Sequence, residues 1–89
     1  MAHCPPELLD DLADLFAEVR GWGGITEKKR GVFYLHRAPF LHFHLLEGPR
    51  RCGDIKGRDG WARFELPRPI SVARRRMFLR EIKARYRPK

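Results

Sequence analysis

The chain has 89 residues, a formal net charge of +8 and 43% hydrophobic residues, values that describe one small domain and exclude a wholly disordered protein. No apolar run approaches the ~18 residues of a membrane-spanning helix, and the first residues lack the basic and apolar regions of a signal peptide. A cytoplasmic protein with no membrane partner is therefore predicted. Cys4 and Cys52 have no CxxC spacing, so we expect reduced thiols, with one disulfide as the alternative.

The first predicted element is a helix over residues 6–20. Proline at position 6 suits the first turn, and Glu7 is favourable at the positive end of the helix dipole. Gly21 follows as the expected C-cap. Between these ends the apolar residues recur at helical spacing and form one stripe, which consists of Leu8, Leu12, Leu15, Phe16 and Val19.

Four β-strands are expected in the middle of the chain. The β-rich runs at 32–36 ("VFYLH") and 40–46 ("FLHFHLL") are separated by "RAP", which indicates a hairpin. Two further strands, over 51–56 and 61–66, follow the turn signals "GP" and "GRDG". Residues 25–31 either extend the first strand or form a short extra one.

The last predicted element is a helix that begins after Ser71, a residue type that commonly caps helix N-termini. Its apolar stripe consists of Val72, Phe78, Leu79, Ile82 and Tyr86. The order α-β-β-β-β-α predicts a two-layer α+β sandwich within a single domain, 1–89. We expect a four-stranded antiparallel sheet with both helices on one face.

Two histidines alternate with apolar residues in "PFLHFHLL" (39–46), and the strand register decides which face they share. A register with His36 opposite Phe40 gathers the apolar residues of both strands on one face. His42 and His44 then lie on the other, outer face. With Ile55 beside Phe43, the third strand places Asp54 directly across from His44, and Asp54 also faces Arg63 in the fourth strand.

The outer face is thus predicted to carry a polar cluster. Its members are Tyr34, His36, His42, His44, Asp54, Arg63 and Glu65, with Phe40, Leu46 and Trp61 at the border. Two histidines at i, i+2 beside a carboxylate can bind a divalent metal, because side chains on one strand face lie within roughly 7 Å. The metal hypothesis names His42, His44 and Asp54; the alternatives are an acid–base or anion site, and a wet sheet face with ordinary cross-strand pairs.

No sequence motif assigns a reaction to the chain. HExxH, zinc-type Cys/His clusters and GxSxG are all missing from the sequence, so catalysis is unsupported and no cofactor is predicted apart from the metal hypothesis. The segment "GVFYLHRAPFLHFHLLEG…DIK" (31–56) resembles short, uncharacterised bacterial proteins in which FY is followed by PFLHFH and an Asp-containing strand. The resemblance implies an α+β fold and a bacterial cytosolic setting, and it adds no catalytic residue.

Charge is distributed unevenly along the chain. Residues 1–26 carry one Arg and five acids, a net −4, whereas residues 67–89 carry nine basic residues and Glu81, a net +8. In the last helix a basic row repeats at i, i+4, i+7 and i+11, and it consists of Arg76, Arg80, Lys83 and Arg87. In the first helix an acidic row has identical spacing, and it consists of Glu7, Asp11, Asp14 and Glu18. The rows pair within or between chains, the basic row binds an anionic partner, or both rows are solvated helix faces.

These patterns favour a small non-enzymatic binding domain for nucleic acid or another polyanion, with the basic row as its anion-binding surface. Further cations widen this surface at Lys28, Lys29, Arg30, Arg37, Arg50, Arg51 and Arg58, and the aromatic residues Tyr34, Phe40 and Trp61 are placed to stack on unpaired bases. One alternative is an enzyme or metal-binding domain that uses the His42/His44/Asp54 face. The other is a self-associating protein, such as a homodimer, whose charge rows pair in its own interfaces.

Overall fold

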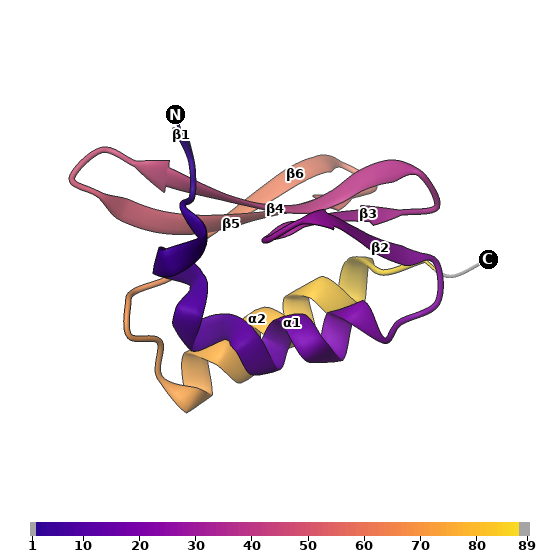
Figure 1. Cartoon of the computed structure of the whole chain (residues 1–89). Helices are drawn as coiled ribbons and strands as arrows, with labels where there is room; N and C mark the ends of the chain where they lie inside the picture. Colours follow the sequence, from indigo (N-terminus) through magenta and orange to yellow (C-terminus); the bar gives the residue numbers. More distant parts are fainter. Residues whose placement is uncertain (1, 88–89) are drawn as a thin grey trace.

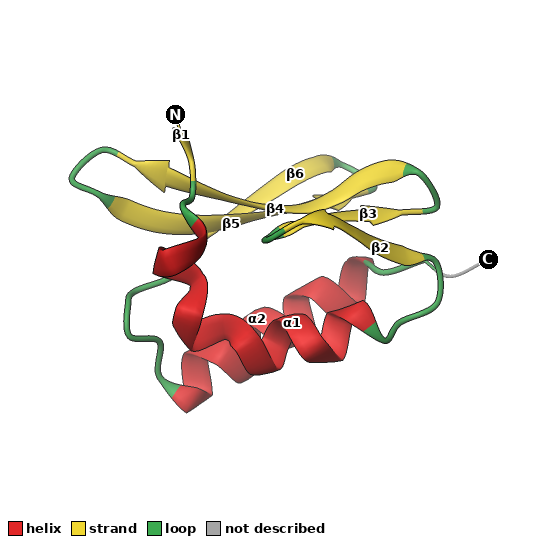
Figure 2. Ribbon diagram, viewed as in Figure 1, coloured by secondary structure: helices red, strands yellow, loops and turns green. Residues whose placement is uncertain are grey.

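A twisted antiparallel sheet forms one layer of the computed structural model, which describes residues 2–87, and the helices form the second layer below it (Figures 1 and 2). The elements in chain order are β1 (Ala2–His3), η1 (Pro6–Leu12), α1 (Ala13–Arg20), β2 (Ile25–Lys29), β3 (Val32–Leu35), β4 (Ala38–Leu46), β5 (Arg50–Gly57), β6 (Gly60–Glu65) and α2 (Val72–Arg85). The α+β class is confirmed. No helix within residues 2–87 is long and apolar enough to cross a membrane.

The sheet has more strands than predicted. Its main path is β2-β3-β4-β5-β6, and the two-residue β1 pairs with the end of β4. The additional strand β2 comes from residues 25–31, whose assignment the sequence left open. Among the described residues it pairs with β3 alone, and two of its exposed positions carry lysines, as is common for an edge strand that does not pair with another chain.

The predicted helix over 6–20 is two segments. Pro6–Leu12 is a 3₁₀-helix and Ala13–Arg20 an α-helix that ends at the expected C-cap, Gly21. The carbonyl oxygen of Leu8 accepts a hydrogen bond from Arg51 Nη1 at 2.7 Å. This contact competes with regular α-helical bonding in the first segment. The predicted apolar stripe is nevertheless inward, with Leu12, Leu15, Phe16 and Val19 buried and Leu8 half-buried.

The last helix begins as predicted, since Ser71 Oγ accepts a hydrogen bond from the Arg74 backbone N–H at 3.1 Å. Phe78 and Ile82 are buried, and Leu79 and Tyr86 are half-buried. Val72 departs from the predicted stripe because it lies in the first turn and is 55% exposed.

A chain of aromatic rings joins both helices to the sheet. Phe16 of α1 lies 5.4 Å from Phe33 and 5.2 Å from Phe43, measured between ring centroids. Phe78 of α2 lies 6.0 Å from Phe43 and 5.8 Å from Phe64. Since both helices contact Phe43, the centre of β4 positions them relative to each other.

The hairpin between β3 and β4 differs from the prediction. The expected three-residue loop "RAP" is a two-residue turn, His36-Arg37, with φ of 50° and 73°, so Leu35 pairs with Ala38. Positive φ at both central residues matches a type I′ turn. Such turns normally contain Asn or Gly, and because this turn contains neither, the sequence does not indicate it. An irregularity then follows, because Tyr34 pairs with Pro39 and Phe33 with Leu41. Phe40 is consequently buried in the core and not at the border of the outer face.

Candidate functional site

The outer face of the sheet brings most of the predicted polar cluster together. His42 and His44 are half-buried on this face, which agrees with the predicted alternation. A hollow of about 370 Å³ lies over the face and is lined by His42, His44, Asp54, Trp61 and Arg63. Tyr34 is adjacent, with its ring centroid 6.4 Å from that of His42. We call these six residues the outer-face cluster.

His36 does not belong to the cluster. It occupies the β3–β4 turn, where its backbone N–H donates to the Gly24 carbonyl at 2.9 Å. A Cβ atom added at Gly24 would lie 2.3 Å from His36 Cε1, so the imidazole covers the Gly24 backbone. The shorter turn explains this correction, because it removes His36 from the strand in which the prediction placed it.

Asp54 is the centre of the cluster and is only 7% exposed. Arg63 clamps its carboxylate with two hydrogen bonds of 2.9 Å, from Nε to Oδ1 and from Nη2 to Oδ2. His44 Nδ1 lies 3.1 Å from Oδ2, so the predicted proximity of His44 and Asp54 is confirmed. The hydrogen bonds from Arg63 hold the pKa of Asp54 below its ordinary value although burial acts in the opposite direction.

His42 has a different environment. Its ring centroid lies 5.3 Å from that of Trp61 and 6.1 Å from that of His44. Its Nε2 atom is buried and has no hydrogen-bond partner among the described residues. Burial lowers the pKa of His42, and the nearby His44 and His3 lower it further, so the ring is neutral at pH 7.

The sequence did not identify Cys52 as a neighbour of His44. The predicted register placed Asp54 opposite His44, but the observed register is shifted by two residues, so that Cys52 pairs with His44 and Asp54 with His42. A shift by two leaves every side chain on its predicted face and changes only its neighbours. The donor atoms of His44, Cys52 and Asp54 consequently lie within 4.8 Å of one another. The predicted metal triad contained His42 instead of Cys52.

Both cysteines are buried, and they are free thiols, as expected from the sequence. Burial raises the pKa of the Cys52 thiol, and the carboxylate of Asp54 adds to the effect. Burial also raises the pKa of the Cys4 thiol. Neither residue therefore has the lowered pKa of a nucleophilic cysteine.

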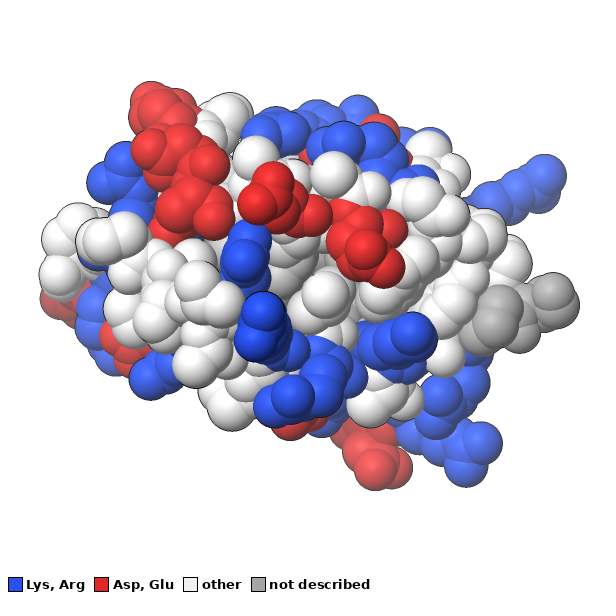
Figure 3. All heavy atoms as spheres, turned by 90° about the horizontal axis from the view of Figure 1, so that it is seen from below, with Lys and Arg blue, Asp and Glu red and all other residues white. Residues whose placement is uncertain are grey.

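The helix side of the molecule carries acidic side chains along α1 and basic side chains along α2 (Figure 3). The groove between them has a volume of about 270 Å³ and is lined by Asp14, Leu15, Glu18, Arg75, Arg76 and Leu79. One ion pair crosses it, from Arg75 Nη1 to Asp14 Oδ2 at 3.2 Å. An acid of the first helix thus pairs with a base of the last, as predicted, but through a residue outside the basic row.

Within one chain, the rows themselves do not pair; pairing between chains stays a prediction. Among residues 2–87, no member of the basic row forms an ion pair with a member of the acidic row. Asp11 pairs with Arg51 instead, and Glu18 accepts a hydrogen bond from Trp22 Nε1 at 3.2 Å. The reason is helix rotation: Arg75 is the half-buried neighbour of α1, and the row that starts at Arg76 lies farther around the helix.

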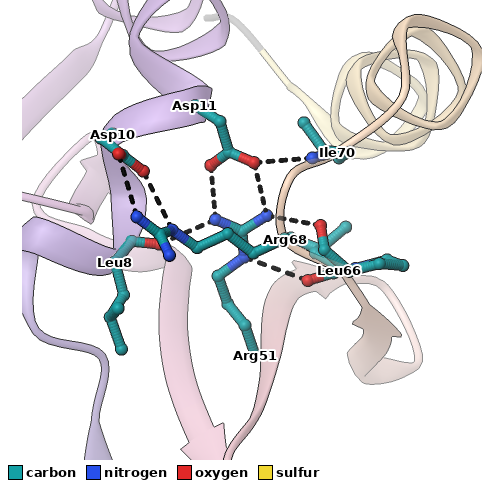
Figure 4. A network of polar contacts seen from close by, with 8 residues as sticks. Leu8, Asp10, Asp11, Arg51, Leu66, Arg68 and Ile70 are labelled. Carbon is teal, nitrogen blue, oxygen red and sulfur yellow. Dashed lines mark hydrogen bonds and ion pairs between the residues drawn. The ribbon is translucent and has the colours of Figure 1, made fainter.

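Arg51 was expected on a polyanion-binding surface, but it is buried at 4% exposure beneath η1 (Figure 4). Its guanidinium binds both carboxylate oxygens of Asp11, from Nη1 to Oδ1 and from Nη2 to Oδ2. It also donates to the carbonyl oxygens of Leu8, Leu66 and Pro67. Asp11 in turn accepts from the Ile70 backbone N–H at 2.7 Å. Arg51 of β5 therefore binds both η1 and the β6–α2 connection, and its role is structural.

We expect Asp11 to make the stability of the domain sensitive to acid. Burial acts to raise the pKa of Asp11, but the hydrogen bonds from Arg51 and Ile70 outweigh it, so the pKa is lower than in the unfolded chain. The resulting stabilisation is fully present above the unfolded value of about 4 and is lost as pH falls through the folded value. Urea unfolding between about pH 7 and 3 measures this. Asp11→Asn should be less stable at neutral pH and less sensitive to acid, and an unchanged acid sensitivity would contradict the assignment.

A second cluster of cations lies where the β5–β6 turn meets the end of α2. Two adjoining hollows of about 510 and 240 Å³ share the lining residues Gly57, Arg58, Arg85 and Arg87. Trp61 lines the larger hollow and Lys56 the smaller one. We call Lys56, Arg58, Trp61 and Arg87 the basic end. The basic end contains Arg87 of the predicted basic row. It also contains Arg58 and Trp61, which the sequence analysis gave as an additional cation and a stacking residue.

Comparisons with protein-family models, with curated proteins and with solved structures find no significant match to this chain. The resemblance to short bacterial hairpin proteins therefore stays a prediction.

Proposed function

We propose that the protein binds single-stranded nucleic acid at its basic end. The observation that supports this proposal is a group of cations beside an exposed indole. Asp59 and Glu81 also line the larger hollow. Among the described residues, no acidic side chain forms an ion pair with Lys56, Arg58 or Arg87. Arg85 differs, because its Nη1 lies 2.7 Å from Glu81 Oε1 and its guanidinium covers the Phe64 ring.

Trp61 favours nucleic acid over other polyanions. Its side chain is 46% exposed at the rim of the larger hollow, and the Lys56 Nζ atom lies 5.6 Å from its ring centroid. An exposed indole offers a stacking surface for any base, and the adjacent cations can contact the phosphates on either side of that base. This combination is typical of sequence-tolerant binding to unpaired strands.

The α2 helix offers a continuation of the same surface. Arg80 and Lys83 lie in the last two turns of α2, whereas Arg87, which the sequence placed in the same helical row, lies two residues beyond the end of the helix. Neither Arg80 nor Lys83 forms an ion pair within residues 2–87. A strand that leaves the basic end would therefore meet further cations. Arg76 contributes less, because it lies in the groove that also contains Asp14 and Glu18.

Chemistry at the outer-face cluster is the second candidate function. A histidine beside a carboxylate, at the 3.1 Å separation of His44 and Asp54, is the usual arrangement of an acid–base pair, and a hollow lies over it. Arg63 already neutralises Asp54, however, and the nearby thiol of Cys52 is buried with a raised pKa. These features favour binding over catalysis at this face.

Self-association is the third candidate, and the opposite charges of α1 and α2 favour it. Two copies related by a two-fold axis could place the acidic helix of each against the basic helix of the other. Such a dimer would leave the basic end accessible, because that end lies at the margin of the sheet. Sedimentation at low and high salt measures the association.

The nucleic-acid proposal predicts weak and salt-dependent binding to a fluorescent single-stranded oligonucleotide, measured by anisotropy. If three phosphates are contacted, affinity should fall about 20-fold between about 50 and 200 mM salt. The pair of substitutions Arg58→Glu and Arg87→Glu should weaken binding to every sequence and reduce the salt dependence. Trp61→Ala should cost about 1–3 kcal/mol with an unchanged salt dependence, because it removes stacking and no charge.

Arg76→Glu, combined with Arg74→Glu, is the matched control. It makes the same change in net charge at the opposite end of α2, and it should weaken binding less than the pair at positions 58 and 87. Equal losses from both pairs would show attraction to net charge alone and would contradict a site at the basic end. Tighter binding to duplex than to single strands would contradict the stacking role of Trp61.

A further inference from the structure

Two residues of the outer-face cluster and the adjacent Cys52 form a set of donor atoms that the proposed function does not use. His44 of β4 pairs directly with Cys52 of β5, and Asp54 lies two residues farther along β5 on the same face. One donor atom from each, a ring nitrogen, a thiol sulfur and a carboxylate oxygen, lies within 4.8 Å of the other two. Three potential ligands from two adjacent strands of a regular sheet are thus held close together.

These distances are near those of a metal centre. With metal–ligand bonds of about 2.0–2.3 Å, the ligand atoms of a tetrahedral zinc site lie about 3.5 Å apart. His44 Nδ1 and Asp54 Oδ2 are already 3.1 Å apart, and the third atom needs to move by only about 1 Å. Rotation of side chains alone can supply a movement of this size.

The surroundings also suit a bound cation. Cys52 is fully buried and Asp54 nearly so, which removes competing water from the donors. Arg63 binds both oxygens of Asp54, Oδ1 through Nε and Oδ2 through Nη2. The bond to Oδ1 can keep the carboxylate oriented when Oδ2 exchanges its bond to Nη2 for a metal. Outer partners of this kind are a regular feature of metal sites.

We propose that His44, Cys52 and Asp54 bind a divalent metal ion of the zinc class. Sulfur and imidazole donors favour zinc over magnesium or calcium, which require oxygen donors. On binding, the sulfur of Cys52 forms a bond to the metal and its proton passes to solvent. His42 lies outside this group of three and lines the hollow above it, where a fourth ligand from solvent would be placed.

Cobalt titration of the full, reduced and metal-free chain tests this site. A Co²⁺ ion bound to a thiolate gives a charge-transfer absorption band in the near ultraviolet. The band should saturate at one ion per chain. Cys52→Ser should abolish it, and Cys4→Ser, which removes the other buried thiol, should leave it intact. Absence of the band in the unaltered protein, or its persistence in Cys52→Ser, would overturn the proposal.

Zinc affinity, measured by competition with a chromophoric chelator, provides the second measurement. His44→Ala should weaken zinc binding by at least about tenfold, since even partners outside the ligand set typically contribute that much. Circular dichroism of each variant establishes that the fold is retained. An affinity that His44→Ala leaves unchanged would overturn the assignment, even if Cys52→Ser does not fold.

Discussion

Replacing Arg51 by alanine should lower the free energy of unfolding by about 3–5 kcal/mol, because it removes one partner of a buried ion pair. The substitution leaves the Asp11 carboxylate without its bidentate partner beneath η1. It also removes the donor to the carbonyl oxygens of Leu66 and Pro67. Urea unfolding, followed by circular dichroism, measures the loss.

Arg50→Ala provides the control for this prediction. Arg50 is the preceding residue, but its side chain is 54% exposed and its partner, Glu65, is exposed as well. Exposed pairs contribute less than about 1 kcal/mol, so this variant should be close to the unaltered protein in stability. If the two variants lost similar amounts, Arg51 would not have the structural role that its contacts indicate.

Phe78→Ala should be destabilising by about 3–5 kcal/mol, because it leaves a cavity between α2 and the sheet. The Phe78 ring is 1% exposed and contacts both Phe43 and Phe64. Asp14→Lys, which reverses an exposed charge of the helix pair Asp14–Arg75, should cost less than about 1 kcal/mol. A larger loss of stability in Phe78→Ala than in Asp14→Lys would show that apolar burial contributes most of the free energy that holds α2 on the sheet.

A double-mutant cycle with Gly53 tests the packing of this ring directly. A Cβ atom added at Gly53 would lie 2.5 Å from Phe78 Cζ, so Gly53→Ala should cost about 1–3 kcal/mol by overpacking. In the Phe78→Ala background the new methyl group enters the cavity, and its cost should be smaller by at least about 0.5 kcal/mol. Additive costs would contradict the contact between position 53 and the ring.

The parts of the fold that the sequence predicted well are those with short, strong local signals. The "GRDG" turn fixes the β5–β6 register, and the predicted pairing of Asp54 with Arg63 is confirmed. The β3–β4 and β4–β5 registers were each misjudged, because the His36-Arg37 turn has no glycine signal and β4 tolerates slippage by two residues. The shift by two in β4–β5 changes direct partners and keeps the face assignments, whereas the irregular β3–β4 pairing also moves Phe40 into the core.

Site residues were also hard to predict from the sequence where their partners come from distant segments. The sequence identified His44 and Asp54 as neighbours, but Cys52 could be recognised as the third donor only with the correct register. Arg51 looked like a surface cation because its partner, Asp11, is 40 residues away. Burial of a charged side chain is decided by tertiary packing, and no local pattern reports it.

The strand order of the sheet has a consequence for how the chain folds. Every strand from β2 to β6 pairs with the strand that precedes or follows it, so each hairpin closes only a short loop. The two helices, by contrast, lie at opposite ends of the chain, and contacts such as Arg75–Asp14 and Tyr86–Gly23 close loops of about 60 residues. We therefore expect the hairpins of the sheet to form early in folding. The helices should dock onto the sheet late, because their contacts close the long loops.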